Sequence, residues 1–221
     1  ISAKKYYYIK TWENRGYNNE FQNRIIRQTS SGQYLTQQDL SFQNLSSSLG
    51  LNLLISESIR GILNFGIISR SPTPSELFSD GLHHAIARIE VGDLRFKSEV
   101  GHKTSLTYSY NNENFNFSIN PFINNIQDFI VIEPVEIRET IRGNFQVWEY
   151  RQSDAQLMGV DVDATYKINN NWNSTHQLSI VKGYERSRDL PLINMPPVST
   201  KNKISYKNKA FKNFKISLQS E

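Results

Sequence analysis

The amino-acid sequence predicts an all-β fold, an antiparallel up-and-down meander of the kind that forms a transmembrane β-barrel. Three observations predict it. Several stretches alternate apolar and polar residues with a period of two, as expected for strands with one apolar face. Short turns alternate with long loops along the chain, and proline is sparse, at 7 of 221 residues. The pattern predicts about nine strands, some of them longer than the five or six residues usual in soluble sheets.

The composition narrows the class of protein. The absence of cysteine excludes a disulfide scaffold and a thiolate metal site. The net charge of +4 is too small to indicate nucleic-acid binding. No segment approaches the roughly 18 apolar residues of a spanning helix, and the start of the sequence lacks the pattern of a signal peptide. A barrel strand turns only every second residue toward lipid, so this polar composition is compatible with a membrane barrel.

The first forty residues give the weakest signals. Ile1–Lys10 is aromatic and uninterrupted, which predicts a strand. Thr11–Gln38 is polar and contains Gly16 and Gly32, so it predicts a long loop that holds a small hairpin around Arg24–Arg27.

Clear alternation begins after Asp39. Leu45 to Ile55 places leucines on one face, Ser56–Ser58 makes a turn, and Ile59–Ile67 returns. After the loop from Arg70 to Lys97, the predicted strands are Val100–Tyr110, Phe115–Ile132 with a bulge at Pro121, Asn144–Ile168, Trp172–Tyr184, Val198–Asn208 and Phe211–Gln219. The charged stretch Glu133–Gly143 and the proline-ended stretch Glu185–Pro197 are predicted as loops.

Loop length also alternates along the chain. The short turns lie near Glu57, Asn112, Asn170 and Lys209, and the long loops all fall at the opposite strand ends. Outer-membrane barrels have short periplasmic turns and longer extracellular loops. Aromatic residues gather beside the short turns, as in an interfacial girdle, although packing inside a soluble β-sandwich would also explain them. These residues are Tyr108, Tyr110, Phe115, Phe117, Tyr166 and Trp172.

One segment carries a family resemblance. Ser69–Glu99 reads SRSPTPSELFSDGLHHAIARIEVGDLRFKSE, with two prolines before a short helical turn and Asp80-Gly81 as a break. It closely resembles the signature segment of TonB-dependent outer-membrane receptors. FQVWEYRQSDAQLMGVDVDATY, from Phe145 to Tyr166, is similar to a later barrel strand of that family, with Asp161 where glutamate is usual. Leu190–Tyr206 is similar to a third segment, with Ser199 or Thr200 where arginine is common.

The resemblance implies a receptor that is not an enzyme and has no resident cofactor. Family barrels have about twenty-two strands, so residues 1–221 are expected to form one incomplete barrel domain without a plug domain. The implied function is TonB-dependent uptake of a metal ion or metal chelate, such as a siderophore, haem or zinc. The implied partners are outer-membrane lipid, the TonB complex acting through a plug, and the extracellular ligand. The alternative is a soluble or surface-attached β-sandwich that binds glycans or mediates adhesion.

The signature segment also contains candidate metal ligands. Imidazole and carboxylate groups together suit zinc, so Asp80, His83, His84 and Glu90, with Asp93 nearby, predict a metal site in an extracellular loop. An ordinary solvated loop explains the same residues. Adjacent histidines in an extended segment point in opposite directions, which weakens joint chelation.

Two further sets of charged residues are better explained by their place on a strand face than by catalysis or nucleic-acid binding. Asp161 and Asp163 share a face expected to line the lumen, and lumen charge explains them better than acid–base chemistry. Four lysines also share one strand face, but Tyr206 lies on the other, so nucleic-acid binding is not indicated. These are Lys201, Lys203, Lys207 and Lys209. No nucleophile elbow, phosphate-binding loop or zinc-protease motif is present.

Overall fold

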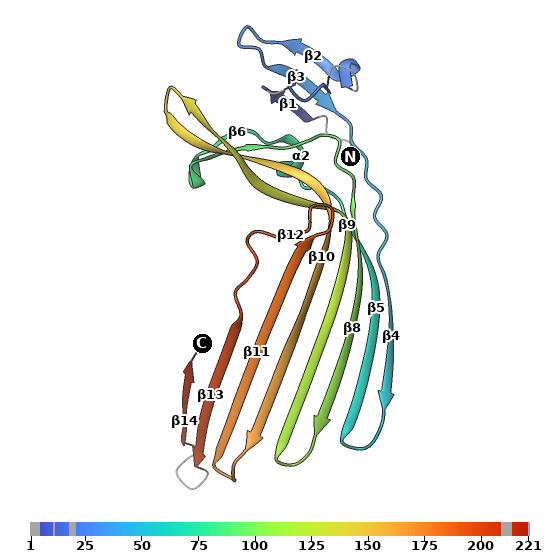
Figure 1. Cartoon of the computed structure of the whole chain (residues 1–221), viewed down its shortest axis with the longest axis vertical. Helices are drawn as coiled ribbons and strands as arrows, with labels where there is room; N and C mark the ends of the chain where they lie inside the picture. Colours follow the sequence, from blue (N-terminus) through green and yellow to red (C-terminus); the bar gives the residue numbers. More distant parts are fainter. Residues whose placement is uncertain (1–4, 11, 18–20, 209–213, 221) are drawn as a thin grey trace. The chain divides into compact units, whose positions relative to one another are not determined.

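The computed structural model describes residues 5–10, 12–17, 21–208 and 214–220. It is almost entirely antiparallel β, with an 11-stranded and a 3-stranded sheet (Figure 1). No helix in the described residues is long and apolar enough to cross a membrane. The chain divides into two compact units. Unit 1 comprises residues 1–44, 70–99 and 128–153, and unit 2 comprises residues 45–69, 100–127 and 154–221.

The sheet of unit 2 is an up-and-down meander in which strands adjacent along the chain lie side by side (Figure 1). It confirms the predicted fold class and eight of the predicted strands, while the first predicted strand belongs to the smaller sheet. The meander consists of β4 (Ser47–Leu54), β5 (Ile59–Arg70), β8 (Glu99–Asn111), β9 (Phe115–Thr140), β10 (Gly143–Lys167), β11 (Trp172–Glu185), β13 (Ser199–Asn208) and β14 (Phe214–Ser220). The short β12 (Leu190–Pro191) pairs with β11.

Strand register separates the two faces of unit 2. Met158, Val160 and Val162 share a face with the residues opposite them on β11, while Asp161 and Asp163 share the other with Ser179 and Gln177. The polar face continues on β13, where Lys201 pairs opposite Gln177. In this part of the meander one face is therefore mainly apolar and the other mainly polar.

The short turns share one local mechanism. A side-chain oxygen at the start of the turn accepts hydrogen bonds from backbone N–H groups two and three residues later. Ser56, Asn112 and Asn169 each do this, at 2.7 to 3.3 Å. These residues define three of the four predicted turns, and the fourth, near Lys209, lies outside the described residues.

The apolar face of unit 2 is exposed. Leu49 is 70 % exposed, Leu106 47 % and Leu218 78 %. A β-sandwich would bury these side chains under a second sheet, so the sandwich alternative is wrong for the described residues. Such a large exposed apolar surface requires an apolar environment or a partner.

Unit 1 contains the smaller sheet, in the order β1 (Lys5–Ile9), β3 (Tyr34–Gln38), β2 (Ile25–Gln28). The predicted stretch Thr11–Gln38 does contain a hairpin, in which β2 pairs antiparallel with β3 and the register is irregular between Ile25 and Arg27. A short 3₁₀ helix, η1 (Gln22–Arg24), precedes it. The buried core of this region consists of Ile9, Trp12, Tyr17, Tyr34 and Leu94.

The remaining elements of unit 1 come from the signature segment. They are α2 (Pro74–Phe78), β6 (Asp80–His83), the 3₁₀ helix η2 (His84–Ile86) and β7 (Arg88–Val91). β6 pairs antiparallel with β7, and β7 pairs parallel with β10 from Gln146 to Glu149. The excursion between β5 and β8 is therefore folded.

Two local predictions are wrong. Glu133–Gly143 is not a loop, because β9 runs to Thr140 and β10 begins at Gly143. Most residues of this stretch are exposed, which suits its charges, and Glu133 pairs with Arg151 at 2.6 Å. Pro121 causes no bulge, since the register of β8 with β9 is the same on both sides of it.

Candidate functional site

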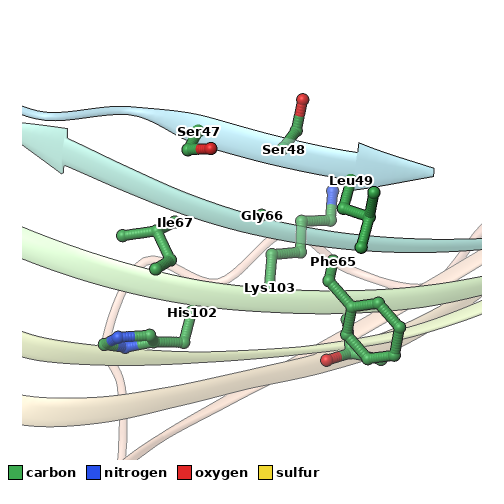
Figure 2. A pocket seen from close by; sticks show the side chains of 9 residues that line it. Ser47, Ser48, Leu49, Phe65, Gly66, Ile67, His102 and Lys103 are labelled. Carbon is green, nitrogen blue, oxygen red and sulfur yellow. The ribbon is translucent and has the colours of Figure 1, made fainter.

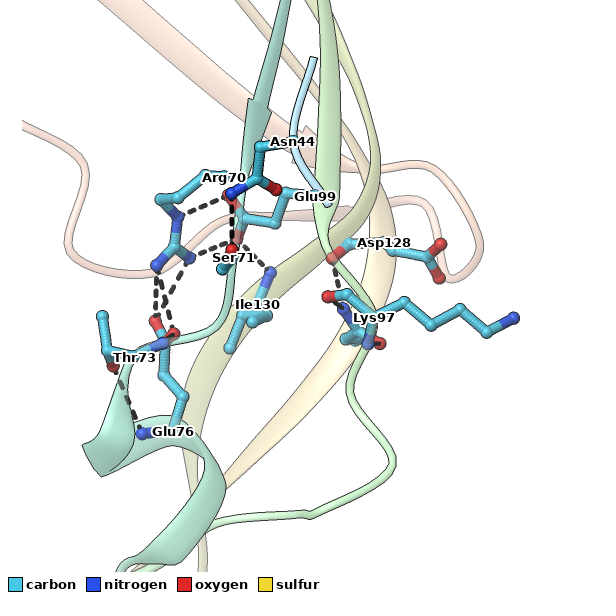
Figure 3. Close-up of polar contacts among 10 residues, drawn as sticks. Asn44, Arg70, Ser71, Thr73, Glu76, Lys97, Glu99, Asp128 and Ile130 are labelled. Carbon is cyan, nitrogen blue, oxygen red and sulfur yellow. Dashed lines mark hydrogen bonds and ion pairs between the residues drawn. The ribbon is translucent and has the colours of Figure 1, made fainter. Parts of the chain in front are cut away.

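An arginine at the end of β5 organises the signature segment (Figure 3). Arg70 donates from Nε and Nη2 to the two oxygens of Glu99, at 2.8 and 2.6 Å, and from Nη1 and Nη2 to the Glu76 carboxylate at 3.1 to 3.2 Å. Glu99 also accepts from the backbone N–H of Ile130, at 2.7 Å. Paired contacts between guanidinium and carboxylate groups fix orientation as well as distance. Arg70 therefore connects β5, α2, β8 and β9 within unit 1.

The helix α2 is held at its first turn. The Thr73 hydroxyl accepts from the Glu76 N–H, and the Glu76 carboxylate accepts from the Thr73 N–H, which is a capping box. Gly92 packs against this turn so closely that a Cβ there would lie 2.4 Å from the Glu76 carbonyl oxygen. A glycine is therefore required at this position.

A second cluster in unit 1 surrounds Asp93. Its carboxylate accepts from the Tyr17 hydroxyl at 3.0 Å and from Arg95 at 2.6 and 3.0 Å, and Arg15 lies 3.6 Å away. Burial raises the pKa of Asp93, but the hydrogen bonds from Arg95 outweigh it, so the pKa of Asp93 is lowered. Burial and the neighbouring Asp93 charge raise the pKa of Tyr17. Asp93 is thus a structural anion.

The predicted metal ligands lie on the β6–β7 hairpin. Asp80 accepts from the backbone N–H of Lys10, and Glu90 is buried and pairs with Arg88 at 2.6 Å. His83 and His84 are exposed. Among the residues that the structure describes, no group of three or more histidine, cysteine, aspartate or glutamate side chains is arranged to hold a metal. The metal site stays a prediction.

The polar face of unit 2 carries two hollows. One of about 570 Å³ is lined by Asp161 and Asp163, which accept from Ser179 and Gln177, both at 2.7 Å. The other, about 410 Å³, is lined by Lys167, Lys203 and Lys207 among asparagine and threonine residues. The predicted common face of the lysines is confirmed for Lys201, Lys203 and Lys207, and Lys209 lies outside the described residues. This face can contact charged solutes or protein.

A smaller hollow of about 260 Å³ lies over β4, β5 and β8 (Figure 2). Leu49, Phe65, Ile67 and His102 line it together with Ser47. The register puts Leu49 and Phe65 opposite each other on the apolar face. Ser48, Lys103 and Thr104 also line this hollow, so its lining is mixed, with apolar and polar groups together.

The aromatic residues beside the short turns cluster on the apolar face. Phe115 contacts Tyr110, Phe117 and Tyr166, with ring centroids 6.2 to 6.5 Å apart, and Trp172 lies 4.9 Å from Tyr206. Their place at one strand end agrees with the predicted girdle.

Comparison with known families decides the class of protein. A family model described as "TonB dependent receptor-like, beta-barrel" matches residues 11–216. The chain belongs to this receptor family. The search of curated protein sequences finds no significant match.

Solved structures of metal transporters and siderophore receptors share the fold. The copper transporter OprC superposes with a TM-score of 0.65 at 21 % identity, over 79 % of this chain and 25 % of that one. The siderophore receptor PirA from Pseudomonas aeruginosa gives 0.58 at 12 % identity, over 84 % and 33 %. The FrpB iron transporter from Neisseria meningitidis gives 0.53 at 17 % identity, over 80 % and 26 %. The chain therefore spans a quarter to a third of the length of these receptors.

Sequence reasoning identified the signature segment but missed the roles of its charged residues. The sequence did contain a signal for these roles. Three charged residues of the signature segment lie at the ends of predicted elements, namely Arg70, Glu76 and Glu99. Their meeting at one point depends on the fold of the whole excursion, which local patterns do not give.

Proposed function

We propose that the chain forms part of the wall of an outer-membrane receptor that imports a metal ion or metal chelate. The observation that carries this proposal is the two-faced sheet of unit 2. Its apolar face is exposed and would contact lipid, and its polar face would line the lumen. The family and its solved relatives, described as transporters or receptors for copper, iron and siderophores, support the proposal.

In this proposal the energy for import comes from the TonB complex, acting through a plug domain. The barrel performs no covalent step in import. The aspartates and lysines of the polar face would contact the plug or the passing ligand. The elements of unit 1, with their buried core and ion pairs, would form the water-exposed loops that select the ligand.

The test is complementation with the complete reading frame that contains this chain. It is expressed in a Gram-negative strain that lacks its own receptors, with ferric siderophore, haem, zinc or copper as the sole metal source. The expected result is growth on at least one source, which is lost when TonB is deleted. Growth on none of them, or growth without TonB, would contradict the proposal.

We further propose that His83 and His84 make the first contact with a metal. Both are exposed, whereas Glu90 is occupied by Arg88. Two imidazoles without a third ligand bind zinc weakly, so millimolar rather than nanomolar affinity is expected. Titration with zinc would test this, with His83→Ala/His84→Ala as the variant and His102→Ala on unit 2 as the control. An unchanged affinity in the double variant would remove the metal site.

A further inference from the structure

Three polar side chains form a hydrogen-bonded row on the apolar face of unit 2. Ser174 Oγ lies 2.8 Å from His176 Nε2, and His176 Nδ1 lies 2.7 Å from Asn202 Oδ1. Ser174 and His176 are two positions apart on β11, so both point to the same face. Asn202 is directly opposite His176 in the register of β11 with β13. The backbone ladder therefore fixes the order Ser–His–Asn.

The hydrogen bonds define where the protons are. An amide oxygen only accepts, so the contact with Asn202 Oδ1 requires the proton on His176 Nδ1. In the neutral imidazole, His176 Nε2 then carries a lone pair, to which the Ser174 hydroxyl can donate. A serine whose proton is directed at a neutral imidazole, with the other ring nitrogen held by a third group, is the arrangement of an activated nucleophile.

The surroundings of the row are uncharged. In the register, Tyr166 and Ile204 lie opposite Ser174, and Ala164 lies opposite His176. Within two positions along this face, β10, β11 and β13 carry no other titratable group except the tyrosines. The residues are Val162, Ala164 and Tyr166 on β10, Trp172 and Leu178 on β11, and Thr200, Ile204 and Tyr206 on β13.

The simpler explanation is that the three groups only satisfy one another on a wall that faces lipid. Polar side chains on such a wall are costly compared with leucine or valine, and an ionisable one is a candidate functional group. Ser174 is only 9 % exposed, whereas His176 is an exposed residue. A substrate would therefore approach from the His176 side.

The position along the strand identifies the substrate class, and this step rests on the proposed function. The row begins two residues after Trp172, whose ring pairs with Tyr206 at the short-turn end. Tryptophan and tyrosine mark the boundary between headgroups and acyl chains. In a barrel with its apolar face in lipid, the row faces the level of the glycerol esters. Acyl esters of phospholipids are thus the compounds within reach.

We propose that Ser174 is a nucleophile for phospholipid acyl esters, with His176 as its general base and Asn202 as a positioning residue. Ser174 Oγ attacks the ester carbonyl carbon while its proton moves to His176 Nε2. The bond between the acyl carbon and the glycerol oxygen breaks, and that oxygen takes the proton. The products are an acyl-serine and a lysophospholipid. Water then attacks the acyl-serine, with His176 again as base, and releases a fatty acid.

Turnover is expected to be slow. β11 is paired on both sides, so its backbone N–H groups are engaged in the ladder rather than free to form an oxyanion hole. The covalent step is therefore the most direct readout. A long-chain alkyl fluorophosphonate reacts with activated serines and resembles the acyl ester.

The experiment uses the full chain in phosphatidylethanolamine vesicles, with the modified residue identified by mass spectrometry. Ser174 should carry the phosphonate adduct, and Ser174→Ala should carry none at this position. His176→Ala should slow labelling by about 100-fold or more, the usual contribution of a general base. Ser205→Ala is the matched control, because Ser205 lies on the opposite face near the same strand end. Its labelling should equal that of the parent chain.

Asn202 is tested by the pH profile of labelling. Asn202→Asp keeps an acceptor oxygen but adds a negative charge, which stabilises the imidazolium. His176 then loses its proton at higher pH, so the midpoint of the profile should move upward. Asn202→Leu should slow labelling at every pH. A purely structural asparagine would leave the midpoint unchanged.

Absence of a Ser174 adduct, or equal rates in His176→Ala and the parent chain, would overturn the assignment. Quenching of tryptophan emission by brominated lipid reports insertion separately, with Trp172→Phe identifying the contribution of Trp172. Quenching without labelling of Ser174 would overturn the assignment of Ser174 as a nucleophile and would leave the receptor proposal standing. Absence of quenching would overturn both, since the substrate assignment requires this face in lipid.

Discussion

The two units of the chain use apolar side chains in opposite ways. Among the described residues, every buried hydrophobic side chain except Ile126 and Ala155 lies in unit 1. Most of the large hydrophobic side chains that are exposed lie in unit 2. The tightest ion pairs, such as Arg70–Glu99 at 2.6 Å, are also in unit 1. The buried apolar side chains are therefore concentrated in unit 1, and the large exposed ones in unit 2.

This difference is compatible with a polar overall composition, because a strand with one apolar face needs apolar residues only at alternate positions. None of the clusters of buried hydrophobic residues in the described part of the chain lies in unit 2. Unit 1 instead packs its buried apolar side chains in clusters with one another. The boundary between the two designs falls inside single strands, as at Arg70 in β5.

The largest effect is expected from emptying the core of unit 1. Trp12 is fully buried, at 0 % exposure, and packs on Tyr17 and Tyr34. Trp12→Ala should cost about 3–5 kcal/mol, because truncation leaves a large cavity. Hydrogen exchange of β1 and β3 measures the loss. Trp172→Ala, at a 40 % exposed position of unit 2, should leave that protection unchanged. Equal loss in both variants would contradict the division.

A charge on the apolar face tests unit 2 in the same way. Leu106→Arg should destabilise the protein in lipid by about 2–4 kcal/mol if the residue lies near the midplane. Ser105→Arg, one residue away on the polar face, should cost little. Urea unfolding in vesicles measures both variants. An equal loss of stability in the two variants would contradict the proposal that only the apolar face contacts lipid.

A single methyl group tests the packing of the signature segment. Gly92→Ala should cost about 1–3 kcal/mol, because the new Cβ would clash with the Glu76 carbonyl oxygen. Gly81→Ala is the control, since a Cβ there meets nothing within 4 Å. Amide exchange in α2 should quicken in the first variant only.

The smallest expected effect is a loss of stability of unit 1 at acidic pH. The pKa of Asp93 is lowered from its ordinary value of 3.8, so the stability it contributes is present above that value. That contribution is lost as the pH falls through the lowered pKa. Protection of Leu94 and its neighbours should therefore decline below about pH 4. The Asp93→Asn variant should be less stable at neutral pH, and its stability should depend less on pH in acid. A parallel decline in the variant would exclude Asp93 as the cause.

The sequence predicted the strands of unit 2 better than the elements of unit 1. Val100–Tyr110 was predicted within one residue of β8, because the alternation there is uninterrupted. The pattern fails where both faces are solvated, and the end of β9, with Glu133 and Glu136, was therefore mistaken for a loop.

The candidate sites were harder to predict, because they depend on contacts between distant residues. Tyr17 and Asp93 are 76 positions apart, and His176 meets Asn202 only through strand register. The candidate metal ligand Glu90 could not be seen to pair with Arg88 before the hairpin was known.

The most direct test of the central claim measures which faces of unit 2 touch acyl chains. The sequence has no cysteine, so single cysteines can carry a fluorophore at Ser105, Leu106, Val162 and Asp163. In vesicles with brominated acyl chains, strong quenching is predicted at positions 106 and 162 and weak quenching at 105 and 163. Equal quenching at neighbouring positions, or none at 106 and 162, would contradict the account.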